Sequence, residues 1–247
     1  MTRDEDLSRV LLARLPEARV SVGLSAPVTE YSDYDDRAVA AWHGEVDLHV
    51  DPEDVDDPAE VQAWARPDAA LSRQDVVGGG ATQRLVVATA RGLVLDLDAH
   101  PDVRLALDES ADYAHFMPLF ERPGAYGVNE EFDELIDGAG NRVVLLDRAL
   151  LAPAWRGLGG VGRLLTARML RWLMSDALLA ITQPAPFEID GGAADPAYRT
   201  ALQQVRGVWS SLGFSHWRDD IWYLDPALVA FDDAVAALED RLGLRRD

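Results

Sequence analysis

One segment, residues 141–175, limits what this chain can fold into more than any other. It begins with an apolar run from Val143 that predicts a β-strand, and Pro153 predicts its end, because a proline ring removes a backbone donor. Residues 156–162 then read Arg-Gly-Leu-Gly-Gly-Val-Gly, and apolar residues from Leu165 onward recur at helical spacing. A glycine-rich turn that opens a helix presents free N–H groups and the positive end of the helix dipole. The segment therefore predicts a strand, a turn and a helix, with an anion site at the turn.

Gly157, Gly159 and Gly162 fit the spacing G-x-G-x-x-G of dinucleotide-binding folds. In those folds the first glycine directly follows the strand, and an acidic residue lies about 20 positions further on, at the end of the next strand. Here several residues, Pro153 among them, precede Gly157, and the next predicted strand, 177–183, ends without an acid. A Gly-Lys-Ser/Thr sequence is absent as well, which disfavours a P-loop. A dehydrogenase is therefore only the third interpretation.

Residues 151–159, Leu-Ala-Pro-Ala-Trp-Arg-Gly-Leu-Gly, resemble the signature of the GNAT superfamily, the Gcn5-related N-acetyltransferases. That signature is a strand, a proline followed by an aromatic residue, and then Arg/Gln-x-x-Gly-x-Gly/Ala at the start of a helix. Arg156 and Gly159 match its first two fixed positions, and Val161 departs from the third. A tight turn without a ligand is the alternative interpretation of the same glycines.

The resemblance implies that the loop binds the pyrophosphate of acetyl-CoA or another acyl-CoA. It also implies that the backbone of the preceding strand binds the pantetheine arm. The residues implied in cofactor binding are Leu150, Leu151, Ala152, Arg156, Gly157, Leu158, Gly159, Gly160, Val161 and Gly162.

In the family a carboxylate on that strand often acts as the base, frequently through water. Asp147 is the matching candidate. The period of two along a strand predicts that its side chain shares a face with Ala149 and Leu151. An ion pair with an arginine is an equally good interpretation of this aspartate.

The family's usual general acid is a tyrosine in the helix before a Gly-Phe pair. Trp209 holds the matching position and cannot protonate a thiolate. Tyr223, on the last predicted strand, is a candidate acid that is out of register. His115 is a candidate auxiliary base, and a structural histidine is the other interpretation.

The residues after the loop support the same resemblance. An amphipathic helix over 195–212 leads to Leu-Gly-Phe at 212–214 and to a short hairpin, an order similar to the second half of the GNAT fold. We expect an α+β fold, GNAT-like and in three layers, with a mixed, mainly antiparallel central sheet flanked by helices. The expected units are an N-terminal extension packed on the core (1–82), a GNAT-like core (83–225) and a C-terminal helix (226–247).

The N-terminal half departs from the family's usual order of a strand, two helices and a hairpin. Residues 45–50 alternate as a half-buried strand does. Runs at 84–89 and 92–97 predict a hairpin, and a helical stripe predicts a helix over 109–121 that borders the substrate cleft.

Composition narrows the partners. The 43 acidic and 23 basic residues give a net charge of −20, which disfavours nucleic acid and anionic membranes. The same charge would modestly favour a cationic acceptor, and a solvated acidic surface without a binding role is the stronger interpretation. There is no cysteine, and the five histidines are scattered, so we expect no metal site. The apolar runs fall short of the ~20 residues that a membrane-spanning helix needs. We expect a cytoplasmic protein.

These observations favour an acyl-CoA-dependent N-acyltransferase that transfers an acetyl group by direct attack of an amine. The acceptor would be a small-molecule or peptide amine. The alternative is a catalytically inactive GNAT-like module that binds CoA or a partner. A homodimer through the amphipathic C-terminal helix is left open.

Overall fold

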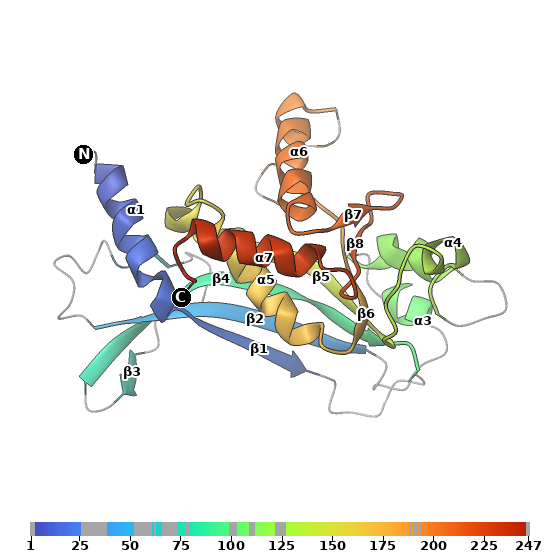
Figure 1. Cartoon of the computed structure of the whole chain (residues 1–247), viewed down its shortest axis with the longest axis horizontal. Helices are drawn as coiled ribbons and strands as arrows, with labels where there is room; N and C mark the ends of the chain where they lie inside the picture. The colour runs from blue at the N-terminus through green and yellow to red at the C-terminus, as the bar shows by residue number, and fades with distance from the viewer. Residues whose placement is uncertain are drawn as a thin grey trace.

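The computed structural model of the 247-residue chain describes residues 3–25, 39–51, 61, 63–65, 74–77, 80–98, 103–108, 112–121, 127–187, 189, 192 and 194–245. These residues form a mixed, mainly antiparallel sheet with helices on both faces, which confirms the predicted α+β class (Figure 1). None of the helices in this part of the chain is long and apolar enough to cross a lipid bilayer.

The sheet runs through the whole molecule. In spatial order its main path is β1 (Arg19–Ser25), β2 (Val39–Val50), β4 (Gly80–Asp96), β5 (Arg142–Leu151), β6 (Ala177–Thr182), β8 (Trp222–Leu224) and β7 (Ser215–His216), and β3 (Gln74–Val77) pairs with β4. Only β5 and β6 are parallel; the other neighbours are antiparallel among the described strands. The N-terminal strands therefore belong to the same sheet as the strand that precedes the glycine loop.

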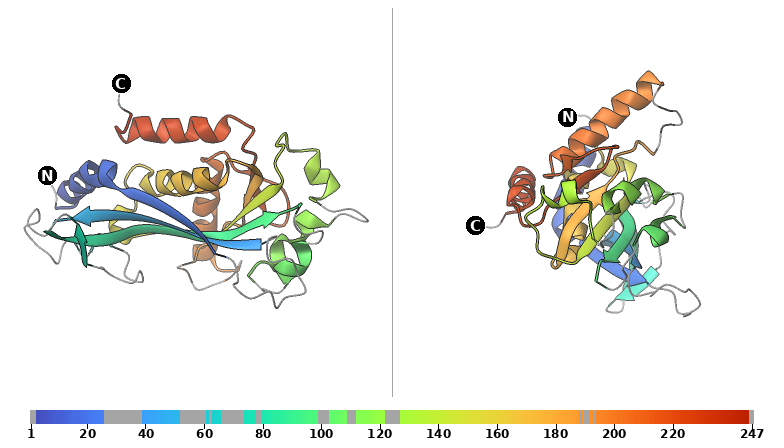
Figure 2. Two further views of the ribbon diagram at one scale, coloured as in Figure 1. Left: turned by 90° about the horizontal axis from the view of Figure 1, so that it is seen from below. Right: turned by 90° about the vertical axis from the view of Figure 1, so that its right-hand side faces the viewer.

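The helices divide between the two faces (Figure 2). One face is covered by α1 (Arg3–Arg14), η1 (Leu15–Glu17), η4 (Pro153–Trp155), α5 (Val161–Leu173), the end of α6 (Pro196–Ser210) and α7 (Ala230–Arg241). The other is covered by α3 (Val103–Asp108), η3 (Ala114–Phe120) and α4 (Glu130–Asp133).

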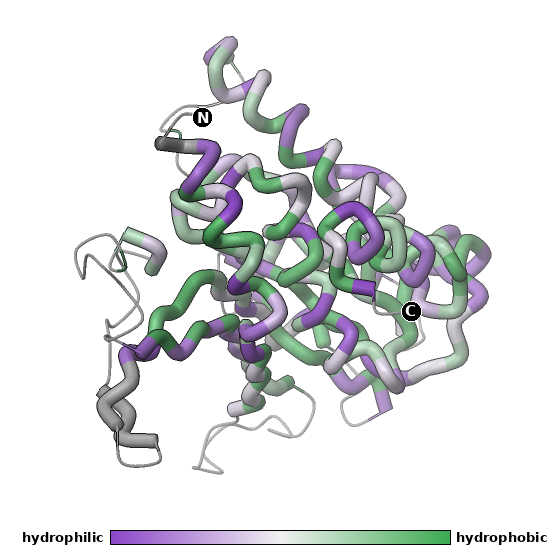
Figure 3. Tube along the Cα trace, turned by 60° about the vertical axis from the view of Figure 1, so that its left-hand side comes forward, coloured by the Kyte–Doolittle hydropathy of each residue, from purple (hydrophilic) through white to green (hydrophobic). Residues whose placement is uncertain are grey.

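Two hydrophobic cores result, one on each face of the sheet. In β5, Val144 and Leu146 belong to the α5 core, whereas Val143 and Leu145 belong to the core under η3 and α4. Figure 3 shows hydrophobic stretches along the central strands and mixed residues along the helices. Burial on both faces explains why β5 and β6 read as nearly continuous apolar runs instead of alternating ones.

The predicted hairpin around residues 84–97 is wrong, because β4 continues without a turn from Gly80 to Asp96. The small residues in its middle serve close packing. Trp42 Nε1 donates a hydrogen bond to the Leu145 carbonyl at 2.9 Å, directly beside Gly92. A side chain at position 92 would occupy that space, so the glycine marks a packing constraint within a strand.

The structure also differs from the α-helix predicted over 109–121. The first three of these residues lie outside the described part of the chain. The remainder forms the 3₁₀ helix η3, with Pro118 inside it. Proline lacks the N–H that an α-helix needs there, and a short 3₁₀ segment still buries Phe116, Leu119 and Phe120 in the second core.

Gly92→Ala is expected to lower the free energy of unfolding by at least about 2 kcal/mol, because overpacking forces the backbone to move. The new Cβ would stand 1.8 Å from the Leu145 carbonyl oxygen. Urea unfolding followed by tryptophan fluorescence measures the change. The matched control is Gly23→Ala on the edge strand β1, where a Cβ meets nothing within 4 Å. A change of equal size in both variants would contradict the packing argument.

Candidate functional site

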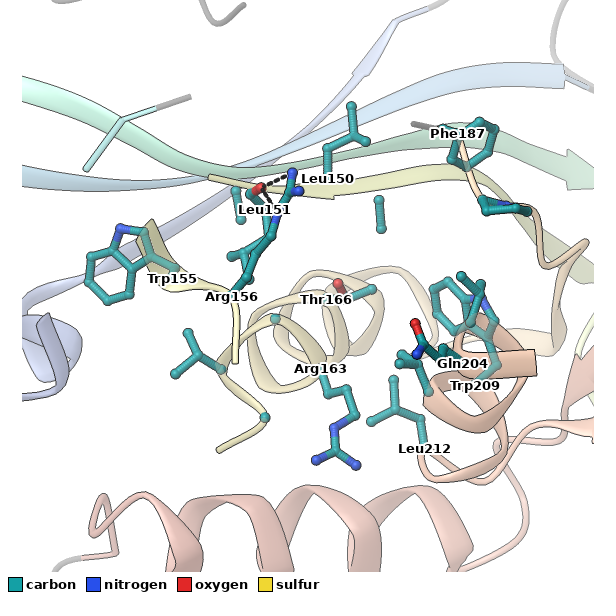
Figure 4. Close-up of a pocket in the computed structure, with 18 of the residues that line it drawn as sticks. Leu150, Leu151, Trp155, Arg156, Arg163, Thr166, Phe187, Gln204, Trp209 and Leu212 are labelled. Atoms are coloured by element: carbon teal, nitrogen blue, oxygen red, sulfur yellow. Dashed lines mark hydrogen bonds between the residues drawn. The ribbon is translucent and has the colours of Figure 1, made fainter. Parts of the chain in front are cut away.

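A pocket of about 760 Å³ opens between the second half of β5, the glycine loop with the start of α5, and α6 (Figure 4). Nine of the ten residues implied in cofactor binding line it: Leu150, Leu151, Arg156, Gly157, Leu158, Gly159, Gly160, Val161 and Gly162. Ala152 is fully buried and packs in the α5 core instead. The structure therefore brings the strand end and the loop to one cavity.

The pocket exists because two parallel strands part. The last pair between β5 and β6 joins Leu146 to Thr182, and β5 continues to Leu151 without β6 beside it. The side chain of Thr182 donates a hydrogen bond to the Leu146 carbonyl at 3.0 Å, at the point of parting. Pro184 and Pro186 follow shortly after β6, and neither could donate to a continuing ladder. One edge of β5 therefore borders the pocket and can pair with an extended ligand.

The loop between η4 and α5 requires glycine at several positions. Gly157, Gly159 and Gly160 have φ angles of +74°, +63° and +110°, a conformation that other residues rarely adopt. Gly160 is the N-cap of α5, and its first turn has no side-chain cap. The Val161 N–H donates to the Leu158 carbonyl at 3.2 Å, whereas no backbone acceptor is found in the described chain for the N–H groups of Gly162 and Arg163, which are therefore available to an anion.

The charge of the pocket is opposite to that of the whole chain. Its described lining includes the three arginines Arg156, Arg163 and Arg241 and one acid, Asp147. Arg156 donates from Nε and Nη2 to the Leu151 carbonyl at 3.2 and 3.1 Å, which fixes the guanidinium between the strand end and the loop. A chain of net charge −20 thus concentrates cations at one end of one cavity.

Helix α6 forms the far wall and stands away from the sheet (Figure 1). Its described residues are mostly half-buried or exposed, and Trp209 is the buried one, packed edge-to-face on Phe214 with centroids 5.3 Å apart. The residues that α6 and its C-terminal end contribute to the lining are Ala201, Gln204, Val205, Val208, Trp209 and Leu212. This wall is mainly apolar.

Asp147 does not share a face with Ala149, so the prediction from strict alternation is wrong. A bulge interrupts the β4–β5 pairing, in which Arg91 faces Arg148 and Gly92 faces Leu146. One extra residue in a strand shifts the alternation beyond it. The Asp147 carboxylate accepts a hydrogen bond from Arg91 Nε at 3.0 Å and is close enough to Tyr113 and His115 of the η3 region to affect their pKa values, and Asp147 also lines the pocket. The predicted ion pair with an arginine is confirmed.

The charge of Asp147 affects the pKa values of two side chains in the η3 region, His115 and Tyr113. Burial lowers the pKa of His115, and the charges of Asp147 and Asp112 partly oppose the effect. Burial also raises the pKa of Tyr113, and the charge of Asp147 raises it further. His115 Nε2 is buried and has no hydrogen-bond partner among the described residues, and His115 is not part of the pocket lining.

Tyr223 also lies outside the lining. It pairs with Ile181 in the sheet and packs edge-to-face on Phe132 in the second core, with centroids 4.8 Å apart. The structure therefore separates Tyr223 from the residues of the loop.

The pocket lining also includes Arg163, Arg241 and Phe187, which were not predicted from the sequence. Arg163 could have been found from its place in the first turn of the predicted helix. Arg241 could not, because it lies 79 positions after Gly162 and reaches the pocket through the docking of α7. Phe187 could not have been predicted either. It lies on the segment that follows β6, and its ring packs under the Arg148 guanidinium.

Comparison of the chain with protein-family models, with curated proteins and with solved structures finds no match. The function is therefore inferred from the pocket itself.

The wild-type protein is expected to lose stability as the pH falls below about 6.5 through protonation of His115. The folded state lowers the pKa of His115 below its ordinary value of 6.5, so the unfolded chain binds more protons in that range. The stability advantage of wild type over His115→Gln should therefore shrink between about pH 7.5 and about pH 5. Urea unfolding at both pH values measures it, and a difference that does not depend on pH would refute the effect.

Proposed function

We propose that this chain is an acyl-CoA-dependent N-acyltransferase of the GNAT type, which binds acetyl-CoA or another acyl-CoA in the pocket between β5, α5 and α6. One observation carries the proposal. An anion site and the open edge of a strand border the same apolar cavity, and a CoA thioester presents phosphates, an amide-bearing arm and an apolar end in that order.

The pyrophosphate is assigned to the glycine loop. The uncapped first turn of α5 offers backbone N–H groups, and Gly157, Gly159 and Gly160 keep side chains out of the way. Arg156 and Arg163 add charge, and Arg163 is held by a hydrogen bond from Nη1 to Ser211 Oγ at 2.8 Å. Directed donors matter here because the protein as a whole repels anions.

The pantetheine arm is assigned to the open edge of β5. Its two amide groups are spaced along an extended chain, and an extended chain with amides can pair with a strand that lacks a neighbour. Leu150 and Leu151 lie on this edge, and the apolar wall of α6 faces them across the pocket. The thioester then lies toward Thr182 and Asp147, where β5 and β6 part.

In the proposed reaction the acceptor nitrogen forms a bond to the thioester carbonyl carbon, and the carbon–sulfur bond breaks. The nitrogen loses a proton to a base, and the sulfur leaves as a thiolate that takes a proton from water. Asp147 is the proposed base, directly or through water, because it lines the pocket at the parting of the strands. Neutral His115 is a second acceptor on the same side of the sheet.

A second candidate is a GNAT-like module that binds CoA without turnover. Trp209 favours it, because this residue lines the pocket where the family places an acidic tyrosine and its indole cannot protonate a thiolate. The acceptor in the first candidate is proposed to be a small-molecule or peptide amine, which the net charge of −20 would attract.

Acetyl-CoA is expected to raise the melting temperature by several degrees at about 100-fold excess over Kd, since this excess stabilises the folded state by about 2.7 kcal/mol. Arg156→Glu should abolish the shift by placing a carboxylate beside the pyrophosphate. The control Arg9→Glu makes the same change of charge on α1, at a side chain that is 72% exposed, and should keep the shift. Absence of any shift with acetyl-CoA, longer acyl-CoAs and free CoA would refute CoA binding.

Release of free CoA thiol in the presence of a panel of amines tests catalysis. Asp147→Asn is expected to lower the rate of release by at least about 100-fold, the usual contribution of a general base, with the affinity for acetyl-CoA unchanged. Arg91→Gln is the matched control, because it breaks the same ion pair and keeps the carboxylate. Binding without release for every amine would favour the inactive module, and equal rates in wild type and Asp147→Asn would remove Asp147 from the mechanism.

A further inference from the structure

Helix α7 lies against the glycine loop, far from it in sequence. A Cβ on Gly160 would stand 2.6 Å from Leu238 Cδ2, and a Cβ on Gly159 would stand 3.4 Å from Leu242 Cδ2. The same Gly159 position is 4.0 Å from Arg241 Cδ, so the stem of this arginine runs directly over the loop. The last turn of α7 therefore forms part of the wall at the anionic end of the pocket.

Phe231, Val235 and Leu238 of α7 are buried in the α5 core, and two ion pairs join the same helices at their surface. Arg168 of α5 pairs with Glu239, and Arg171 of α5 pairs with Asp232. These contacts tie both ends of α7 to α5, and Figure 2 shows the two helices side by side. The position of Arg241 over the loop is thus set by a docked helix.

Unlike three other arginines at the contact between α5 and α7, Arg241 has no carboxylate partner among the described residues. Arg168 and Arg171 pair with carboxylates of α7, and Arg245 pairs with Asp240. No ion pair or hydrogen bond to Arg241 is found among the described residues, and its side chain lines the pocket. Arg241 is exposed, so water solvates its guanidinium in the free protein and the group is available to an anionic ligand in the pocket.

We propose that Arg241 binds the 3′-phosphate on the ribose of coenzyme A, so that α7 completes the nucleotide end of the site. The proposal rests on the proposed CoA-binding function. Coenzyme A carries two anionic centres, a pyrophosphate and a phosphomonoester on its ribose. The loop N–H groups, Arg156 and Arg163 serve the first centre. Arg241 reaches the loop from α7, with its Cδ 4.0 Å from the Cβ position of Gly159, and so adds a separate cation for a second phosphate on the same nucleotide.

An arginine in the last turn of a helix also interacts favourably with the helix dipole. Such a structural role would change stability and would leave the choice between ligands unaffected. The test therefore compares two ligands that differ only in the 3′-phosphate, CoA and dephospho-CoA, by isothermal titration calorimetry on the full-length protein.

Wild type is expected to bind CoA at least about tenfold more tightly than dephospho-CoA, since a charge-assisted contact of this kind is worth at least about 1.4 kcal/mol. Arg241→Gln should bring the ratio of the two affinities close to one and leave dephospho-CoA binding unchanged. Arg241→Met keeps most of the aliphatic stem over Gly159 and should also bring the ratio of the two affinities close to one. It provides a second test if Arg241→Gln folds poorly. Arg245→Gln, on the same helix end, should keep the wild-type ratio.

Loss of the preference in Arg163→Gln but not in Arg241→Gln would overturn the proposal, and so would equal wild-type affinity for both ligands. In these cases CoA binding itself would stand. Absence of binding to either ligand would remove the proposed function together with this inference. The same pair of measurements with NADP and NAD asks whether the phosphate belongs to a dinucleotide; a preference for NADP over CoA that Arg241→Gln removes would overturn the assignment to coenzyme A.

Discussion

The parting of β5 from β6 after Leu146 and Thr182 is the feature on which the rest of the candidate site depends. Parallel strands normally continue together, and a continued β6 would occupy the edge of β5 that borders the pocket. The prolines soon after Thr182 prevent this, because they cannot donate to a ladder. The bulge at Asp147 interrupts the regular pairing of β5 with β4 just beyond the same point. The pocket is therefore a consequence of strand geometry, and the glycine loop and α6 close it.

The glycine loop satisfies two independent constraints at once. Its positive φ angles at Gly157, Gly159 and Gly160 exclude most side chains, and the docking of α7 removes the space that a side chain at Gly160 would need. The ion pairs between α5 and α7 use Asp232 and Glu239, and Glu239 is next in sequence to Leu238, which packs against Gly160. The acid nearest to this contact is thereby paired, and Arg241 is the charged residue of α7 that lines the pocket.

Local chemistry made part of this site predictable. A proline, a run of glycines and a helical period act within a few residues, so β5, the loop and α5 follow from the sequence. The sequence did not predict which side chains of β5 share a face beyond Leu146. A bulge depends on the pairing register with β4, and it changes the alternation at Asp147. The hairpin predicted from residues 84–89 and 92–97 was wrong for the same kind of reason: Gly92 packs against Trp42 and Leu145, and these contacts leave no trace in the local sequence. Arg241 needs the tertiary docking of α7.

The bulge also separates binding from chemistry in the proposed enzyme. The loop, the arginines and the apolar wall of α6 lie on the α5 side of the sheet, whereas the Asp147 carboxylate affects the pKa values of His115 and Tyr113 in the η3 region. A ligand held along β5 would meet Asp147 at the end of the β5–β6 pairing, where this residue lines the pocket. On this arrangement Trp209 belongs to the binding wall, so the missing tyrosine limits proton delivery to the thiolate without weakening the case for CoA. In the proposed enzyme η3, whose helix type the sequence pattern did not predict, is the element whose His115 interacts electrostatically with the proposed base.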